Sequence, residues 1–165
     1  MRRLDNSRFG FPSNCFVCEP ANSHGLRVPF THDEDASLVF AEFSLGDAFS
    51  GAPNYVHGGL ILALLDEAMA WATIAIGERF AVTQRMDATF DRPVRVGRPH
   101  RVEAFVDGQD ETGLDTHAHV LKSDGRRCAE AHARFVILSA AAAEAAIGTV
   151  SGDDAKLLGP EPPAR

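Results

Sequence analysis

The longest apolar run of the chain spans residues 60–76, and its apolar side chains cover nearly every helical face. This pattern predicts a long helix that is buried on all sides, because a surface helix would carry one apolar stripe. We expect the helix to begin near His57 or Gly58 and to end near Gly77, since glycine is common just after a helix. A helix this apolar must be wrapped by other elements.

Strand-like segments on both sides of this helix supply that wrapping. Residues 46–54 read as a loop punctuated by Gly and Pro, and the links between the later segments carry turn residues. Short links favour antiparallel pairing, so we expect one strand, the helix and then an antiparallel meander, which is an α+β fold. The expected strands are 37–45, 80–90, 100–106, 114–122 and 126–138.

The chain divides into three segments around one core, for which 165 residues are sufficient. Residues 1–35 form an N-terminal leader, and residues 36–139 form the central domain. Residues 140–165 begin with an alanine-rich run that predicts a short helix. They continue from Gly148 as a small, polar, Pro-rich tail that we expect to be mobile.

Charge and cysteine content narrow the class of partner. The chain has 16 basic and 23 acidic residues and a net charge of −7, which disfavours nucleic acid and anionic membranes and favours a small molecule. Asp66 and Glu67 interrupt the apolar run, and no signal-type segment follows the charged N-terminus. Three cysteines do not make a disulfide framework, so we expect a cytoplasmic protein.

Candidate chemistry lies where the helix begins. Residues 55–59 place Gly58 and Gly59 at the start of the apolar helix, which carries Asp66 further along. The first backbone N–H groups of a helix lack intrahelical partners and lie at the positive end of its dipole, so they can polarise an ester or thioester carbonyl. Glycine lets a ligand approach that backbone closely.

These residues resemble a known family. The order of elements, with His57-Gly58-Gly59 followed by Asp66, is similar to the hotdog-fold acyl-CoA thioesterases of the phenylacetate-pathway and 4-hydroxybenzoyl-CoA type. The resemblance covers roughly residues 14–138, and its other parts are the helix-entry loop 51–59, the next strand at 82–83 and 90–94, and a leader at 14–18 and 24–26. It implies a hotdog domain over 36–139, with a long central helix wrapped by an antiparallel sheet.

The resemblance also implies roles for single residues. Gly58 matches the backbone N–H that serves as oxyanion donor, and Asp66 matches the acid that acts as nucleophile or general base. His57 matches the histidine before the glycines, and Thr83 matches a hydroxyl residue that assists hydrolysis. One departure is Gly51, where some relatives have Asn or Gln seven residues before the first glycine; Asn54 or Ser50 could supply that polar group.

Substrate contacts follow from the same picture. Coenzyme A carries phosphates, for which arginine side chains are suited. The arginine candidates are Arg79, Arg85, Arg92, Arg95 and Arg98, and the acyl pocket is expected from Phe49, Tyr55, Leu62, Met69 and Phe90. Among all of these, the residues chosen as substrate-binding are Gly59, Asn54, Tyr55, Met69, Arg85 and Arg92.

Each candidate also has a purely structural interpretation. Asp66 could satisfy a backbone group or face solvent, with Glu67 as the reserve acid. His57 could bond the loop as a helix-terminal residue, and Thr83 could be an ordinary strand residue. Three histidines lack a ligand pattern and are expected at a surface or interface: His117, His119 and His132.

Cys15 and Cys18 form a single Cys-x-x-Cys pair. With His24 and Cys128 they could complete a zinc site, or they could form a redox pair. One pair alone favours simple packing of the N-terminal loop, so we predict no metal and no organic cofactor.

The spacing along the helix predicts an assembly. Gly58 and Asp66 are eight residues apart, which is about 12 Å along a helix, so one carbonyl cannot contact both in one chain. We therefore expect a homodimer with composite sites, with a dimer of dimers (homotetramer) also open. The sequence predicts an acyl-CoA thioesterase. The alternative is a non-catalytic acyl-CoA-binding protein, although binding a neutral thioester would not need a carboxylate that is costly to bury.

Overall fold

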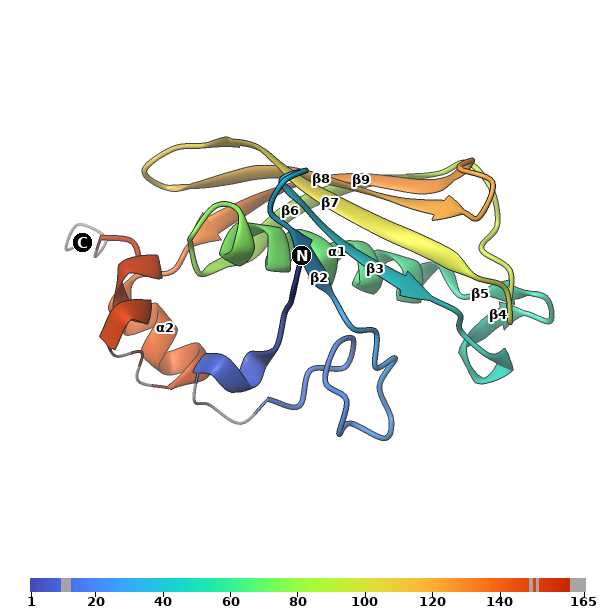
Figure 1. Ribbon diagram of the computed structural model, residues 1–165, viewed down its shortest axis with the longest axis horizontal. Coiled ribbons are helices and arrows are strands. Elements are labelled where there is room, and N and C mark those ends of the chain that lie inside the picture. The colour runs from blue at the N-terminus through green and yellow to red at the C-terminus, as the bar shows by residue number, and fades with distance from the viewer. Residues whose placement is uncertain (10–12, 149, 151, 161–165) are drawn as a thin grey trace.

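The computed structural model describes residues 1–9, 13–148, 150 and 152–160, and within them one long helix lies against a seven-stranded antiparallel sheet (Figure 1). The strand order is β1-β2-β3-β7-β8-β9-β6. These strands are β1 (Arg2–Arg3), β2 (Thr31–Asp33), β3 (Leu38–Phe43), β6 (Ala81–Phe90), β7 (His100–Gln109), β8 (Gly113–Lys122) and β9 (Arg127–Ile137). The remaining elements are η1 (Asn6–Phe9), η2 (Asp47–Phe49), β4 (Ser50–Ala52), β5 (Tyr55–Val56), α1 (Gly58–Ala75), α2 (Ala140–Ile147) and η3 (Gly152–Leu157). The predicted α+β hotdog fold is confirmed.

The predicted meander is wrong in one respect. Strand β6 pairs with β9 at the far edge of the sheet, so the chain crosses the sheet before it enters β7. The N–H groups of Asp91 and Arg92 donate to the Cys128 carbonyl oxygen at 2.8 and 3.0 Å, and they hold the start of this crossing on β9. Turn residues show that a strand has ended, but they do not show which strand becomes its neighbour.

Helix α1 is buried on the side that faces the sheet. Leu64, Leu65 and Met69 have no exposed surface, whereas Leu62, Ala63, Asp66, Ala70 and Ile74 are half-buried. The prediction of burial on all sides is therefore wrong for a single chain, because a strip of the helix still reaches solvent. The helix is long and apolar enough to cross a membrane, but here it is the core helix under the sheet.

A row of alanines lets α1 approach the sheet closely. Cross-strand pairs align Ala104 of β7, Ala118 of β8, Ala131 of β9 and Ala88 of β6, and the first three have no exposed surface. Alternation places every second residue of a strand on the same face, so this row lies toward the core. Small side chains in the row leave room for the larger side chains of the helix.

The N-terminal segment covers α1 on the side away from the strands (Figure 1). Its backbone pairs with itself, since Leu26 N–H donates to the Phe16 carbonyl oxygen at 2.7 Å and Val28 N–H donates to that of Val17 at 2.8 Å. Val17, Leu26 and Val28 are buried in the core. The leader is thus part of the packing around the helix.

The short helix predicted from Ala140 is present as α2. Beyond it, Leu157 is buried, and its carbonyl oxygen accepts from Phe80 N–H at 2.8 Å. Residues 149, 151 and 161–165 lie outside the described residues, so mobility of the tail and the three-part division of the chain stay predictions.

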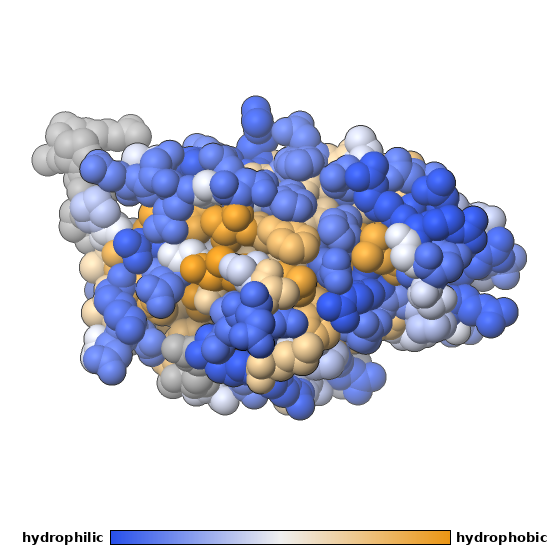
Figure 2. Space-filling model, turned by 45° about the horizontal axis from the view of Figure 1, so that its top comes forward, coloured by the Kyte–Doolittle hydropathy of each residue, from blue (hydrophilic) through white to orange (hydrophobic). Residues whose placement is uncertain are grey.

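The outer face of the sheet carries paired charges. Glu103 accepts from Arg101 at 2.6 Å and lies 3.0 Å from the His119 ring, and the His117 ring stacks on Phe105 with 4.8 Å between centroids. His117 and His119 share this face, as their spacing predicts. Figure 2 shows a largely hydrophilic face with apolar side chains gathered near its middle.

Gly113→Ala should destabilise the protein by about 1–3 kcal/mol, because overpacking a close contact forces the backbone to move. A Cβ at Gly113 would overlap the Phe135 carbonyl oxygen and lie 3.0 Å from Arg134 Nε. Gly46→Ala is the matched control, since a Cβ there meets nothing within 4 Å. Urea unfolding of both variants measures the difference, and equal midpoints would contradict this packing.

Candidate active site

The N-terminus of α1 offers one free backbone donor. His57 is the N-cap residue, with extended backbone angles (φ −60°, ψ 132°), and its Nδ1 accepts from Gly59 N–H at 2.9 Å. Among the described residues, no partner is found for Gly58 N–H. His57 therefore uses the Gly59 donor for structure and leaves the Gly58 donor for a ligand. The family resemblance assigned the oxyanion donor to Gly58 and substrate binding to Gly59, and both roles stay predictions.

The free donor lies at a hollow of about 200 Å³. A Cβ on Gly58 would come no closer than 3.8 Å to the Phe90 ring, so the approach to this backbone is open. The hollow combines apolar and charged walls, which are Val56, Gly58, Ile61, Phe90, Asp91, Arg92, Pro93 and Val94. A carbonyl group of modest size could reach the helix end here.

The β4–β5 hairpin explains the glycine at position 51. A Cβ on Gly51 would lie 3.0 Å from the His57 Cα and 3.1 Å from its ring, so a side chain would displace the capping histidine. Asn54 and Tyr55 are exposed on the same hairpin, and Arg95 lies over the Tyr55 ring at 5.9 Å. An amide at position 51 would thus require a different path of this loop.

Asp66 and Thr83 are in direct contact. The Thr83 hydroxyl donates to Asp66 Oδ1 at 2.5 Å, which joins the half-buried strip of α1 to the edge strand β6. Thr83 is paired in register with the buried Phe135 of β9, so it lies on the face of the sheet that meets the helix. This hydrogen bond orients the carboxylate at a place that solvent and ligands can reach.

Glu67, the reserve acid, faces a different group. Its carboxylate and the Cys15 and Cys18 sulfur atoms all lie within 4.8 Å of one another. Burial, strengthened by the negative charges of Cys15 and Asp66, raises the pKa of Glu67 to about 7. The Cys18 thiol donates to Cys15 and lowers the pKa of that thiol, and the same bond raises the pKa of Cys18.

His24 and Cys128, which the sequence left open as further zinc ligands, are not in the cluster that this cysteine pair forms. Within the described residues the pair meets Glu67 rather than His24 and Cys128, and Cys128 lies in β9 with its sulfur 4.0 Å from the Pro93 carbonyl oxygen. Sequence spacing missed Glu67 because the leader and the helix are distant along the chain. The only sequence signal for this contact was an acid inside an apolar helix.

The other candidates occupy separate places. Arg92 lines the hollow and donates to the Arg127 carbonyl oxygen at 2.8 Å. Arg85 is exposed on β6 and lies 3.3 Å from Asp87. Met69 has no exposed surface, so the structure gives it a packing role.

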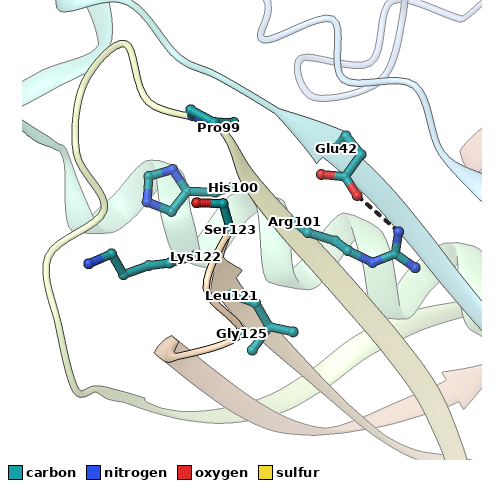
Figure 3. Close-up of a pocket in the computed structure, with 8 residues that line it drawn as sticks. All are labelled: Glu42, Pro99, His100, Arg101, Leu121, Lys122, Ser123 and Gly125. Carbon is teal, nitrogen blue, oxygen red and sulfur yellow. Dashed lines mark hydrogen bonds and ion pairs between the residues drawn. The ribbon is translucent and has the colours of Figure 1, made fainter.

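A larger hollow, of about 400 Å³, lies at the end of the sheet (Figure 3). Glu42, Arg101 and Leu121 form one cross-strand row in it, on the face turned away from α1. The Arg101 guanidinium is already bound to Glu42 at 2.9 Å and Glu103 at 2.6 Å. This hollow contains neither Gly58 nor Asp66, so size alone does not identify the reactive site.

Comparisons with known proteins agree with this fold. The model of the thioesterase superfamily matches residues 53–129. Protein RHA08564, a thioesterase superfamily protein, has a TM-score of 0.67 and 25% identity, and the match covers 71% of this chain but only 57% of that one. A candidate thioesterase from Ralstonia eutropha JMP134, related to phenylacetic acid degradation, has a TM-score of 0.62 and 23% identity over 72% of this chain and 91% of that one.

A Streptococcus mutans protein bound to acetyl-CoA has a TM-score of 0.60 and 17% identity, and the match covers 66% of this chain and 87% of that one. No curated protein matches the chain. Fold and helix-end geometry thus define an α+β hotdog protein with a polar site at the helix. The family match over residues 53–129 makes this hotdog domain similar to the thioesterase superfamily.

His57→Ala should lower the free energy of unfolding by about 1 kcal/mol, because the helix loses its N-cap acceptor. His57→Asn should retain most of the stability, since asparagine also caps helices well. Chemical unfolding of the two variants measures this cap. An alanine variant as stable as the wild type would show that the Nδ1 contact contributes nothing to folding.

Proposed function

We propose that the protein is an acyl-CoA thioesterase that hydrolyses a thioester to a free acid and coenzyme A. The observation that carries this proposal is the Asp66 carboxylate, oriented by Thr83 at an accessible place on the central helix. The free Gly58 N–H at its hollow supplies the second element that such a reaction needs. Matched structures that contain acetyl-CoA or coenzyme A support this class of substrate.

In the proposed reaction, Gly58 N–H donates to the thioester oxygen and stabilises the negative charge that develops there. Asp66 then acts in one of two ways. It removes a proton from a water that attacks the carbonyl carbon, or it attacks that carbon itself and forms an anhydride that water hydrolyses. In both cases the carbon–sulfur bond breaks, and coenzyme A leaves as a thiolate that takes up a proton.

The reaction requires a second chain. Gly58 and Asp66 belong to one continuous helix, so their separation of about 12 Å persists in the folded protein. Strand β6 is an edge strand of ten residues, and β9 is its only neighbour in the part of the chain that the structure describes; Val82 is 47% exposed and Phe90 is 52% exposed. Long open edges favour pairing with another chain. A homodimer joined at this side would place Gly58 of one chain near Asp66 of its partner, and dimers could pair further into a tetramer.

The surrounding residues fit a bound coenzyme A in part. Arg92 brings a positive charge to the Gly58 hollow, and Arg85, Asn54 and Tyr55 are exposed enough to contact a long ligand. A cytoplasmic location remains a prediction from the sequence alone. The assay described next would identify which class of acyl group the substrate carries.

Asp66→Asn should lower kcat by at least about 100-fold, because the amide is neither a base nor a nucleophile. Thiol release from aryl, short-chain and long-chain acyl-CoAs measures the loss and identifies the acyl class. Thr83→Val should give a smaller loss that Thr83→Ser restores, since serine keeps the hydroxyl group. Tight acyl-CoA binding without hydrolysis by the wild type would instead establish a non-catalytic binding protein.

Gly58→Pro should lower kcat by about 100- to 1,000-fold, because it removes the oxyanion donor alone. Position 58 is the first residue of the helix, where proline is tolerated, and His57 before it already has the extended backbone that proline requires. Gly58→Ala is the matched control, since it keeps the N–H and has room for a Cβ.

Refolding Gly58→Pro together with Asp66→Asn tests the shared site directly. In a random mixture half of the dimers are mixed, and each mixed dimer has one intact site, so about a quarter of the wild-type rate should return. Sedimentation confirms that the mixed material is dimeric. No recovery in a dimeric sample would mean that both groups act within one chain or that one of them does not act.

A further inference from the structure

We propose that Cys15, Cys18 and Glu67 form a binding site for a thiophilic divalent cation, for which Zn²⁺ is the best fit. The two sulfur atoms and a Glu67 oxygen lie within 4.8 Å of one another. Zn–S bonds of about 2.3 Å and Zn–O bonds of about 2.0 Å place tetrahedral ligands about 3.5 to 3.8 Å apart. Shifts of about an ångström would therefore close the three groups around one ion.

Hydrogen bonds already favour the thiolate form that binds a metal. Cys15 Sγ accepts from Val17 N–H at 3.3 Å and from Cys18 N–H at 3.4 Å. Cys18 Sγ accepts from the Asn6 side-chain amide at 3.3 Å. Donors directed at sulfur stabilise negative charge on it, so the loop favours Cys15 as a thiolate, and a bound cation would take the place of the Cys18 proton that Cys15 now accepts.

The charges of the cluster explain why a cation fits better than packing alone. Two thiolates and a carboxylate in one half-buried place would repel one another, and a divalent ion offsets that repulsion. Soft sulfur ligands select zinc-like ions over Mg²⁺ and Ca²⁺, which prefer oxygen. Three protein ligands leave a fourth position for water.

Backbone hydrogen bonds hold the loop that carries Cys15 and Cys18 in place. Val28 N–H donates to the Val17 carbonyl oxygen at 2.8 Å, and Glu19 N–H donates to that of Cys15 at 3.3 Å. A bound ion would join this loop to α1 at the residue next to Asp66. It would also offset the charge of Glu67 beside the proposed catalytic carboxylate.

Metal analysis of the wild-type protein, stripped of metal and reloaded with Zn²⁺, should find one ion per chain. Reloading with Co²⁺ should give a thiolate-to-cobalt charge-transfer band in the near ultraviolet. Trp71 is the single tryptophan, and it lines a cleft together with Cys18 and Asn6, so its fluorescence should change when the ion binds. All three readouts are independent of thioester hydrolysis.

Removing any one ligand should weaken Zn²⁺ binding strongly, and the variants to test are Cys15→Ser, Cys18→Ser and Glu67→Gln. Loss of a residue that only supports a ligand costs about 10- to 100-fold in affinity, so loss of a ligand itself should cost more. Cys128→Ser is the matched cysteine control and should bind normally. Asp66→Asn should bind normally too, which separates this site from the proposed reaction.

Two results would overturn the proposal. One is wild-type protein that takes up no stoichiometric metal and gives no cobalt band. The other is a Cys15–Cys18 disulfide in the protein as purified without added oxidant, which alkylation and mass measurement would reveal. The wild-type loading experiment remains decisive even if the cysteine variants fail to fold.

Discussion

The contact between the central helix and the alanine row of the sheet is the constraint on which the rest of the molecule depends. Ala104, Ala118 and Ala131 have no exposed surface, and they allow the larger side chains of α1 to fill the space above them. With the helix held at this depth, its N-terminus reaches the hollow beside Phe90, and Asp66 meets Thr83 on β6. The chemistry is therefore positioned by packing against a row of alanine side chains.

The same contact explains why the two sides of the helix have different roles. One side of α1 is core, whereas the half-buried strip carries the two acids at positions 66 and 67. Asp66 turns toward the edge strand and Glu67 toward the N-terminal leader. Adjacent residues on a helix point about 100° apart, so a consecutive pair of acids serves two different neighbours.

Much of this arrangement was predictable from local patterns. The apolar run predicted α1, alternation and turn residues predicted the strands, and the resemblance carried by residues 51–59 and Asp66 indicated the fold. The position of β6 was not predictable, because periodicity does not reveal which strands become neighbours. The contact of Glu67 with the cysteines is likewise tertiary, and the choice of Gly59 by His57 depends on backbone angles that no residue type dictates.

The alanine row acts as a spacer of fixed thickness between two parts of the site. Asp66 belongs to the helix and Thr83 belongs to the sheet, so the distance between helix and sheet determines how their side chains meet. A side chain larger by one methyl group anywhere in the row would lift α1 and tilt the carboxylate away from its partner. The alignment of Asp66 with Thr83 thus depends on alanine residues of the sheet that lie outside the proposed site.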